Sequence, residues 1–144
     1  MHVAIRRAGP ADRPALASLA ALLDTKTRKA TAEARLAALP ESGHALFLAE
    51  AEGGIVGWLH VFLTWRLTSD RFAEIGGLAV APEQRRRGVG HALLAAAEDW
   101  ARAGGALALR VRVGSKRREA PGLYAAAGFR PLKRQEVYVK DLPG

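Results

Sequence analysis

The sequence contains no cysteine. Disulfide bridges and metal sites built from thiolates are therefore excluded. The four histidines do not show the paired spacing that zinc ligands have in sequence, so we expect no metal site; they are His2, His44, His60 and His91.

Long apolar runs are also missing. No segment reaches the roughly 18 continuous apolar residues of a membrane span, and the N-terminus lacks the apolar core of a signal peptide. We therefore expect a cytoplasmic protein with no membrane partner. The chain has no internal repeat or low-complexity linker, and its 144 residues predict one domain over 1–144 with a single core.

Acidic residues are few compared with basic ones. There are 14 Asp and Glu against 22 Lys and Arg, which gives a formal net charge of +8. Such an excess is compatible with a nucleic acid, an anionic cofactor or a compositional bias toward arginine. The charges are spread along the chain and accompany no known nucleic-acid-binding motif, so nucleic acid is not the favoured partner.

The most informative stretch runs from Phe72 to Trp100. Its β-forming residues end at Val80, and Pro82 cannot continue a strand because proline has no N–H to donate. A helix is predicted next, because apolar residues recur on one helical face at Val89, Leu93, Ala96, Ala97 and Trp100.

The join between this strand and this helix reads Arg85-Arg-Arg-Gly-Val-Gly90. Gly88 and Gly90 allow a sharp turn and a close approach of a ligand to the backbone. The first N–H groups of a helix have no internal partner and lie at the positive end of its dipole. A phosphate or pyrophosphate is therefore favoured here, surrounded by Arg85, Arg86 and Arg87. A plain glycine turn with solvated arginines is the alternative.

Two common phosphate loops are excluded, because the chain has neither Gly-x-x-x-x-Gly-Lys-[Ser/Thr] nor a dinucleotide-binding Gly-x-Gly-x-x-Gly with its distal acid. The pattern Val80-x-Pro-x-x-Arg-x-x-Gly-x-Gly90 instead resembles the acyl-CoA-binding signature of the GNAT superfamily of N-acetyltransferases. Leu123-Tyr-x-x-x-Gly-Phe129 resembles the ending of the same superfamily, and Ser115-x-x-Arg-x-Ala-x-x-x-Tyr124 is similar to a variant in small bacterial members.

The resemblance implies an α/β fold in three layers, α-β-α, with a mixed sheet of about seven strands and four helices. Strands are expected at 2–6, 46–50, 55–63, 72–80 and 106–113, with a last hairpin over 129–142. Helices are expected at 12–23, 31–39 with Thr31 as cap, 88–103 and 121–128. Strands 72–80 and 106–113 should be parallel because a helix connects them. In the superfamily these two strands splay around the cofactor arm.

The resemblance also implies acetyl-CoA as the acetyl donor. A backbone amide at about Leu78 to Val80 would bind the developing oxyanion, as in relatives. Arg117 stands where many members have an asparagine that contacts the cofactor. The expected cofactor-binding residues are Leu78, Ala79, Val80, Arg85, Arg86, Arg87, Gly88, Val89, Gly90, His91 and Arg118.

An acceptor amine with a pKa near 10.4 is mostly protonated at neutral pH, so a base assists its attack. Glu74 is the candidate base, since it resembles the strand glutamate that deprotonates the amine through water in some members. Alternation along the strand predicts that Glu74 shares a face with Leu78 and Val80. An exposed strand residue is the alternative interpretation of Glu74, and Asp70 and Glu50 are weaker candidates.

Tyr124 is the candidate acid for the CoA thiolate, as the matching tyrosine is in many relatives; a core tyrosine beside Phe129 is the alternative.

The resemblance thus implies an N-acetyltransferase that transfers an acetyl group to a primary amine of a small molecule or protein by direct attack in a ternary complex. A non-catalytic acyl-CoA-binding or regulatory module is the alternative function. The polar residues 25–28, which match the acceptor-pocket segment, indicate no unique substrate. Homodimers are common in relatives, so a homodimer is a further expectation.

Overall fold

The computed structural model describes residues 2–85, 87–114 and 120–144. Their five strands form one sheet in the order β1-β2-β3-β4-β5. The strands are β1 (Ala4–Arg7), β2 (His44–Ala51), β3 (Gly54–Arg66), β4 (Ser69–Val80) and β5 (Leu109–Val111). The helices are α1 (Arg13–Leu19), α2 (Lys29–Ala38), α3 (Val89–Ala103) and α4 (Ala120–Ala126).

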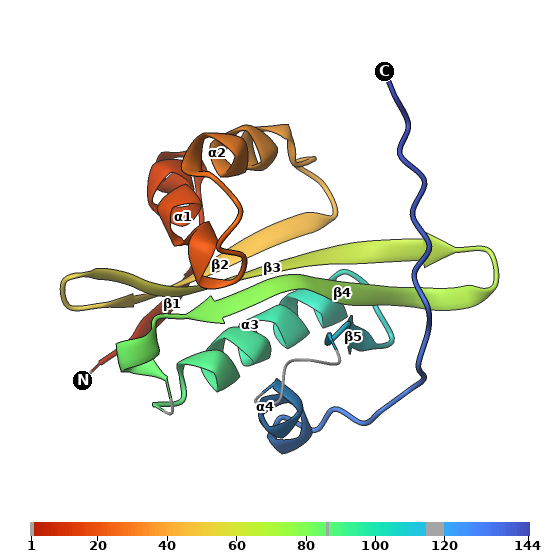
Figure 1. Cartoon of the computed structure of the whole chain (residues 1–144). Coiled ribbons are helices and arrows are strands. Elements are labelled where there is room, and N and C mark those ends of the chain that lie inside the picture. Colours follow the sequence, from red (N-terminus) through yellow and green to blue (C-terminus); the bar gives the residue numbers. More distant parts are fainter. Residues whose placement is uncertain (1, 86, 115–119) are drawn as a thin grey trace.

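The helices lie on both faces of the sheet. Helices α1 and α2 cover one face, while α3 and α4 lie on the other (Figure 1). This arrangement confirms the predicted three-layer α/β fold with four helices.

The main core lies between α3 and the sheet. The predicted apolar stripe of α3 provides its helical half, with Leu93 and Ala97 fully buried, because residues at this spacing share one helical face. The strand half of the core consists of Ala45, Ala49, Leu59, Val61, Ala73 and Ile75. Burial of this apolar stripe fixes α3, and with it the turn that precedes the helix.

Strand β5 is parallel to β4, as predicted, but the two strands pair over a short length. The paired residues run from Ala73 opposite Leu109 to Ile75 opposite Val111. Strand β4 continues to Val80, whereas β5 ends at Val111. Beyond Ile75, the edge of β4 that faces β5 is therefore without a strand partner in the described part of the chain, which agrees with the expected splay.

Strand β4 contains a bulge. His60 of β3 lies opposite Gly77 and Val61 lies opposite Ile75, so Gly76 is an extra residue on β4. An extra residue interrupts the alternation of side chains between the two faces of a strand. Side chains therefore alternate between the two faces of the sheet in one phase before Gly76 and in the opposite phase after it.

The bulge overturns one prediction about the site. Ile75 belongs to the core beneath α3, and Leu78 and Val80 pack against the same core. Glu74 is the neighbour of Ile75 and pairs with Phe62, so its side chain points to the opposite face of the sheet. The prediction that Glu74 shares a face with Leu78 and Val80 is wrong, because Gly76 shifts the alternation by one residue.

The C-terminal segment also differs from the prediction. Residues 130–144 form no strand and are exposed throughout, so the hairpin expected over 129–142 is absent. The described residues accordingly form a sheet of five strands instead of about seven. Proline at 131 favours an extended conformation of Arg130, and the segment contains no Asn-Gly or Asp-Gly pair to form a tight turn. The segment accordingly runs away from α4 as an extended chain (Figure 1).

A smaller correction concerns α2. The helix begins at Lys29, with Arg28 in an extended conformation as its N-cap. The prediction that Thr31 caps this helix is therefore wrong. The backbone of Arg28 is extended, and no side chain caps the start of the helix. The helix is therefore less stable by about 1 kcal/mol than one with a good N-cap residue.

Candidate functional site

The turn that leads from β4 into α3 depends on Gly88. This residue has a φ of 81°, and a Cβ built on it would have no atom of the described residues within 4 Å, its chain neighbours aside. Residues with a side chain rarely adopt this conformation. The first hydrogen bond of the helix runs from the Ala92 N–H to the Gly88 carbonyl at 3.0 Å. The amides of residues 89–91 therefore precede the first hydrogen bond within the helix.

Arg85 stabilises the same turn. Its Nε donates to the Val80 carbonyl at 3.1 Å, which connects the turn to the end of β4. Arg87 and His91 are exposed near the start of α3. Arg86 lies outside the described residues. The Arg85 side chain is thus bound to a backbone carbonyl, whereas the charged side chain of Arg87 is exposed at the surface of the turn.

Two backbone amides of β4 point toward the side that β5 leaves open. The Ala81 N–H donates to the Val56 carbonyl on β3 at 2.8 Å. Because N–H groups alternate between the two edges of a strand, the amides of Leu78 and Val80 point away from β3. The contact of Arg85 with the Val80 carbonyl is on this same edge. The end of β4 therefore presents N–H donors beside the splay.

Helix α4 packs against the first turn of α3. A Cβ built on Gly90 would lie 3.4 Å from both methyl groups of Leu123, so the two helices approach closely there. The Tyr124 ring meets Phe129 edge to face, with 5.4 Å between centroids, and both rings pack against the core beneath α3. Tyr124 therefore lies on the α3 side of the sheet. Residues 115–119, which include Arg117 and Arg118, lie outside the described residues.

Glu74 lies on the other side. Its side chain is 16% exposed, and its Oε1 is 3.3 Å from Nε of Arg112. Arg110 and Arg112 point to this face while Leu109 and Val111 pack against the core. The structure therefore does not bring Glu74 and Tyr124 onto one face. They lie on opposite sides of the sheet, near its β4 and β5 edge.

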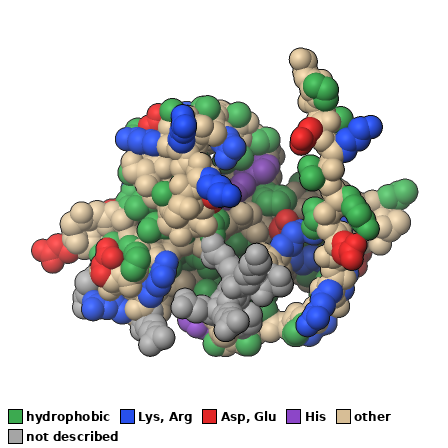
Figure 2. Space-filling model, viewed as in Figure 1, with side chains coloured by type: hydrophobic (Ala, Val, Ile, Leu, Met, Phe, Trp, Pro, Cys, Tyr) green, Lys and Arg blue, Asp and Glu red, His purple; other side chains and the backbone are tan. Residues whose placement is uncertain are grey.

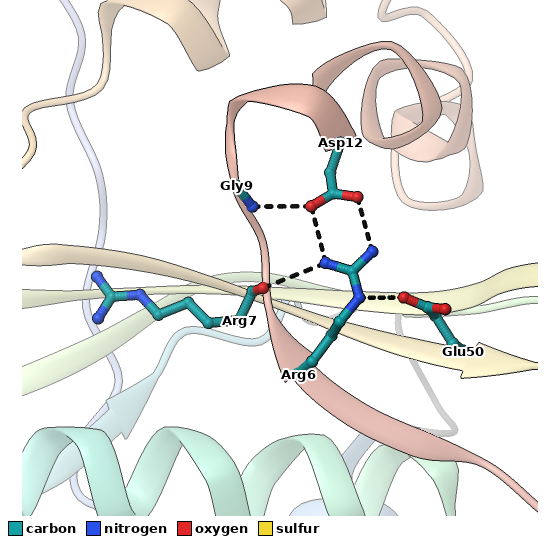
Figure 3. Close-up of polar contacts among 5 residues, drawn as sticks. All are labelled: Arg6, Arg7, Gly9, Asp12 and Glu50. Atoms are coloured by element: carbon teal, nitrogen blue, oxygen red, sulfur yellow. Dashed lines mark hydrogen bonds and ion pairs between the residues drawn. The ribbon is translucent and has the colours of Figure 1, made fainter.

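The two weaker candidate bases have other surroundings. Glu50 forms an ion pair with Arg6, which also binds Asp12 through two hydrogen bonds of 2.7 and 2.8 Å (Figure 3). This cluster joins β1, β2 and the start of α1, and it lowers the pKa of Asp12 to about 2 through the Arg6 guanidinium and the Gly9 N–H. Asp70 is exposed at the start of β4. Glu50 is thus engaged in a structural cluster.

A cavity of about 560 Å³ lies between the α1–α2 layer and the sheet. Its floor on the sheet contains Trp58 and His60 of β3 and Gly76 of the β4 bulge. No motif in the sequence assigned a site role to Trp58 or His60. Their spacing of two residues, which places them on one face of a strand, was the signal that could have identified this floor.

His60 is held in place by a second histidine. Its Nε2 is 3.0 Å from Nδ1 of His44, and the two rings are stacked with 5.3 Å between centroids. Burial, with a contribution from His44, lowers the pKa of His60 to about 4. The His60 ring is therefore neutral at neutral pH and adds no charge to the cavity.

The loop before α2 contributes polar groups to the same cavity. Thr27 lines it, as does Asp24, whereas Thr25, Lys26 and Arg28 are exposed and do not. The Asp24 carboxylate accepts hydrogen bonds from the Lys26 N–H at 3.0 Å and the Thr27 hydroxyl at 2.9 Å. These two bonds lower the pKa of Asp24. Its charge is thus used in part to hold the loop.

The described residues contain no group of three or more histidine and acidic side chains placed to hold a metal ion. Within the same residues, no helix has the length and apolarity to cross a bilayer. The lysine and arginine side chains of the described residues are scattered over the face shown in Figure 2.

Comparison with known proteins identifies the family. A model of the acetyltransferase (GNAT) family matches residues 15–129. Over 131 residues the chain is 33% identical to the uncharacterized N-acetyltransferase YhfO of Bacillus subtilis (strain 168), which covers 87% of this chain and 88% of that protein.

Solved structures share the fold. One is the aminoglycoside acetyltransferase AAC(6')-Iy in complex with the bisubstrate analog CoA-S-monomethyl-acetylneamine, with a TM-score of 0.88, 22% identity and coverage of 99% and 100% of the two chains. Another is the aminoglycoside antibiotic 6'-N-acetyltransferase AAC(6')-Ih from Acinetobacter baumannii, with a TM-score of 0.85, 16% identity and the same coverage. The family match, the sequence relative and the fold agree, and the chain belongs to the acetyltransferase (GNAT) family.

Proposed function

We propose that this protein is an acetyl-CoA-dependent N-acetyltransferase that transfers the acetyl group to a primary amine by direct attack in a ternary complex. The observation that carries the proposal is the opening between β4 and β5, which begins after Ile75 and follows the part of β4 that leads to the Gly88 turn. Family membership supports it, and so do the similar folds whose names include CoA or a CoA-linked analog.

The donor set at the start of α3 fits a pyrophosphate. The open space at Gly88 lets an anion approach the amides of residues 89–91, at the positive end of a helix of 15 residues. Arg87 and His91 supply further donors, and Arg86 and Arg118 remain candidates outside the described residues. When bound there, acetyl-CoA would supply an activated acetyl group joined to a good leaving group.

The end of β4 is suited to hold the acetyl carbonyl. Fixed N–H groups that point at a developing negative charge stabilise it without reorganisation. The amides of Leu78 and Val80 face the opening, and Arg85 fixes the Val80 carbonyl beside them. We assign to these amides the role of oxyanion donors.

In the reaction, a bond forms between the amine nitrogen and the acetyl carbon while the carbon–sulfur bond breaks. The nitrogen loses one proton and the sulfur gains one. Glu74 is the proposed acceptor of the first proton, directly or through water, and Tyr124 is the proposed donor of the second. Their placement on opposite sides of the sheet suits this division, because the amine would approach from the face opposite α3.

The direct test is release of CoA thiol from acetyl-CoA with a panel of small amines and peptides. Acceptor-dependent release with an acetylated product is expected. Glu74→Gln should lower kcat by about 100-fold or more if Glu74 is the base. The matched control is Asp70→Asn, which removes an exposed carboxylate of the same strand and should leave the rate unchanged.

Two results would contradict parts of this proposal. Full activity of Glu74→Gln would remove Glu74 from the mechanism and leave the transferase assignment intact. Acetyl-CoA binding without turnover of any amine or peptide would instead favour the alternative function, a non-catalytic acyl-CoA-binding or regulatory module.

A further inference from the structure

The cavity beneath α1 and α2 is mainly apolar. Nine of its fourteen lining residues are leucine, alanine or tryptophan. The largest of them, Trp58, donates its Nε1–H to the Leu19 carbonyl at 3.0 Å. Its polar group is therefore already used by the protein, and the ring offers an apolar surface to a ligand.

The charges that line the cavity balance. Asp24 and Arg35 are its charged lining residues, one of each sign, and His60 is neutral at neutral pH. The Asp24 carboxylate is also bonded to the loop before α2. A polycation needs several carboxylates in its site to offset the loss of its hydration. This lining does not provide them.

The cavity ends where the proposed reaction would take place. Gly76 lines it, and the splay of β4 from β5 begins after the preceding residue, Ile75. A Cβ on Gly76 would lie 2.8 Å from His60 Nδ1, so this imidazole nitrogen borders the same end. An amine seated with its body in the cavity would therefore present its nitrogen beside the opening.

We propose that the acceptor is a monoamine with an apolar body, such as an arylalkylamine or a branched alkylamine, which occupies this cavity with its amino group at the Gly76 end. The inference rests on the proposed acetyltransferase function and names its substrate class. A volume of about 560 Å³ falls within the roughly 300–1,000 Å³ of small-molecule sites. The expected class differs from that of the aminoglycoside acetyltransferases that share the fold, whose acceptors are polycations.

The test compares acceptors at saturating acetyl-CoA. Phenylethylamine and isoamylamine represent the apolar monoamines, and sisomicin represents the polycations. The apolar amines should show kcat/KM at least about tenfold above that of sisomicin, since one well-buried apolar group contributes a factor of this size.

A pair of variants locates the binding site. Ala20 lines the cavity, whereas its neighbour Ala21 is exposed and does not. Ala20→Trp should raise KM for the apolar amines by at least about tenfold by filling the cavity, while Ala21→Trp should leave KM unchanged. The rise in melting temperature with acetyl-CoA should persist in both variants and shows that they are folded.

The outcomes separate this inference from the proposed function. No melting shift of the wild-type protein with acetyl-CoA would contradict the proposed function itself. With that shift present and turnover of at least one acceptor observed, a preference for sisomicin, no turnover of the apolar amines, or an unchanged KM in a folded Ala20→Trp would overturn the substrate class alone.

Discussion

Single residues set the chemistry of the proposed cofactor site. Gly88 adopts a left-handed conformation that frees the amides at the start of α3, and Arg85 binds the Val80 carbonyl. Both residues belong to a motif that is visible in the sequence. The surroundings of Glu74 and His60 were not predictable, because Arg112 and His44 lie far from them in the sequence and no local pattern pairs them.

The first prediction at this scale concerns Gly88. Gly88→Ala should weaken acetyl-CoA binding by at least about tenfold, because alanine at positive φ costs about 1–2 kcal/mol and the turn would change its conformation. Titration calorimetry measures the affinity. The matched control is Gly53→Ala, since Gly53 also has positive φ and open space but lies in the β2–β3 turn. Equal affinity losses in both variants would contradict the assignment.

The second residue-scale prediction concerns pH. The pKa of His60 is depressed from 6.5 to about 4 in the folded protein, so protonation favours the unfolded state. Its contribution to stability is complete above pH 6.5 and is lost as the pH falls toward 4. We expect a loss on the order of 2 kcal/mol over this window, after allowance for partial exposure.

Urea unfolding at a series of pH values measures this loss. His60→Gln should reduce the pH dependence between 6.5 and 4, and the exposed control His2→Gln should not. Asp12 does not interfere, because the pKa shift of that residue acts below 3.8. An unchanged slope in His60→Gln would show that other groups cause the dependence.

At the scale of elements, the β4 bulge organises the site. The sequence predicted the main strands and the buried stripe of α3 from local patterns of apolar residues, and it predicted the parallel pair from the helix that connects the two strands. It could not predict on which face Glu74 lies, since the alternation is reset at Gly76 by pairing with β3. The cavity could not be predicted from local patterns either, because it forms only when α1 and α2 cover β3.

Glycine at the bulge leaves room for the cavity floor. A Cβ on Gly77 would lie 2.8 Å from the Trp58 ring and 3.1 Å from Leu23. Gly77→Ala should therefore destabilise the protein by about 1–3 kcal/mol through overpacking, which lowers Tm by a few degrees per kcal/mol. Gly114→Ala is the control, because its added methyl group meets no atom of the described residues within 4 Å, its chain neighbours aside. Calorimetric melting curves that coincide for the two variants would contradict the close packing at Gly77.

At the scale of the whole molecule, the sheet ends in two edge strands, β1 and β5, whose outer edges pair with no strand of the described residues. The extended C-terminal segment is a further surface open to association, because Val137, Tyr138 and Val139 are 80–88% exposed. Unpaired strand edges and exposed β-forming residues favour pairing between chains.

We therefore expect the C-terminal segment to control the association state. The full chain should show a mass that rises with concentration in light scattering after gel filtration, and a chain that ends at Arg130 should show much less of this rise. Replacing Val137 and Val139 with lysine, which keeps the length of the segment, should have the same effect as truncation. Identical masses for all three proteins would exclude this segment as the cause of association.

The measurement that tests the account most directly is thermal melting with and without acetyl-CoA. At about one hundred times its Kd, acetyl-CoA should add about 2.7 kcal/mol to the free energy of unfolding. For a chain of this size that corresponds to a rise in Tm of roughly 5–10 °C. Such a rise, reduced in Gly88→Ala and retained in Gly53→Ala, is the predicted result. No rise at millimolar acetyl-CoA would contradict the cofactor site at the start of α3 and the function built on it.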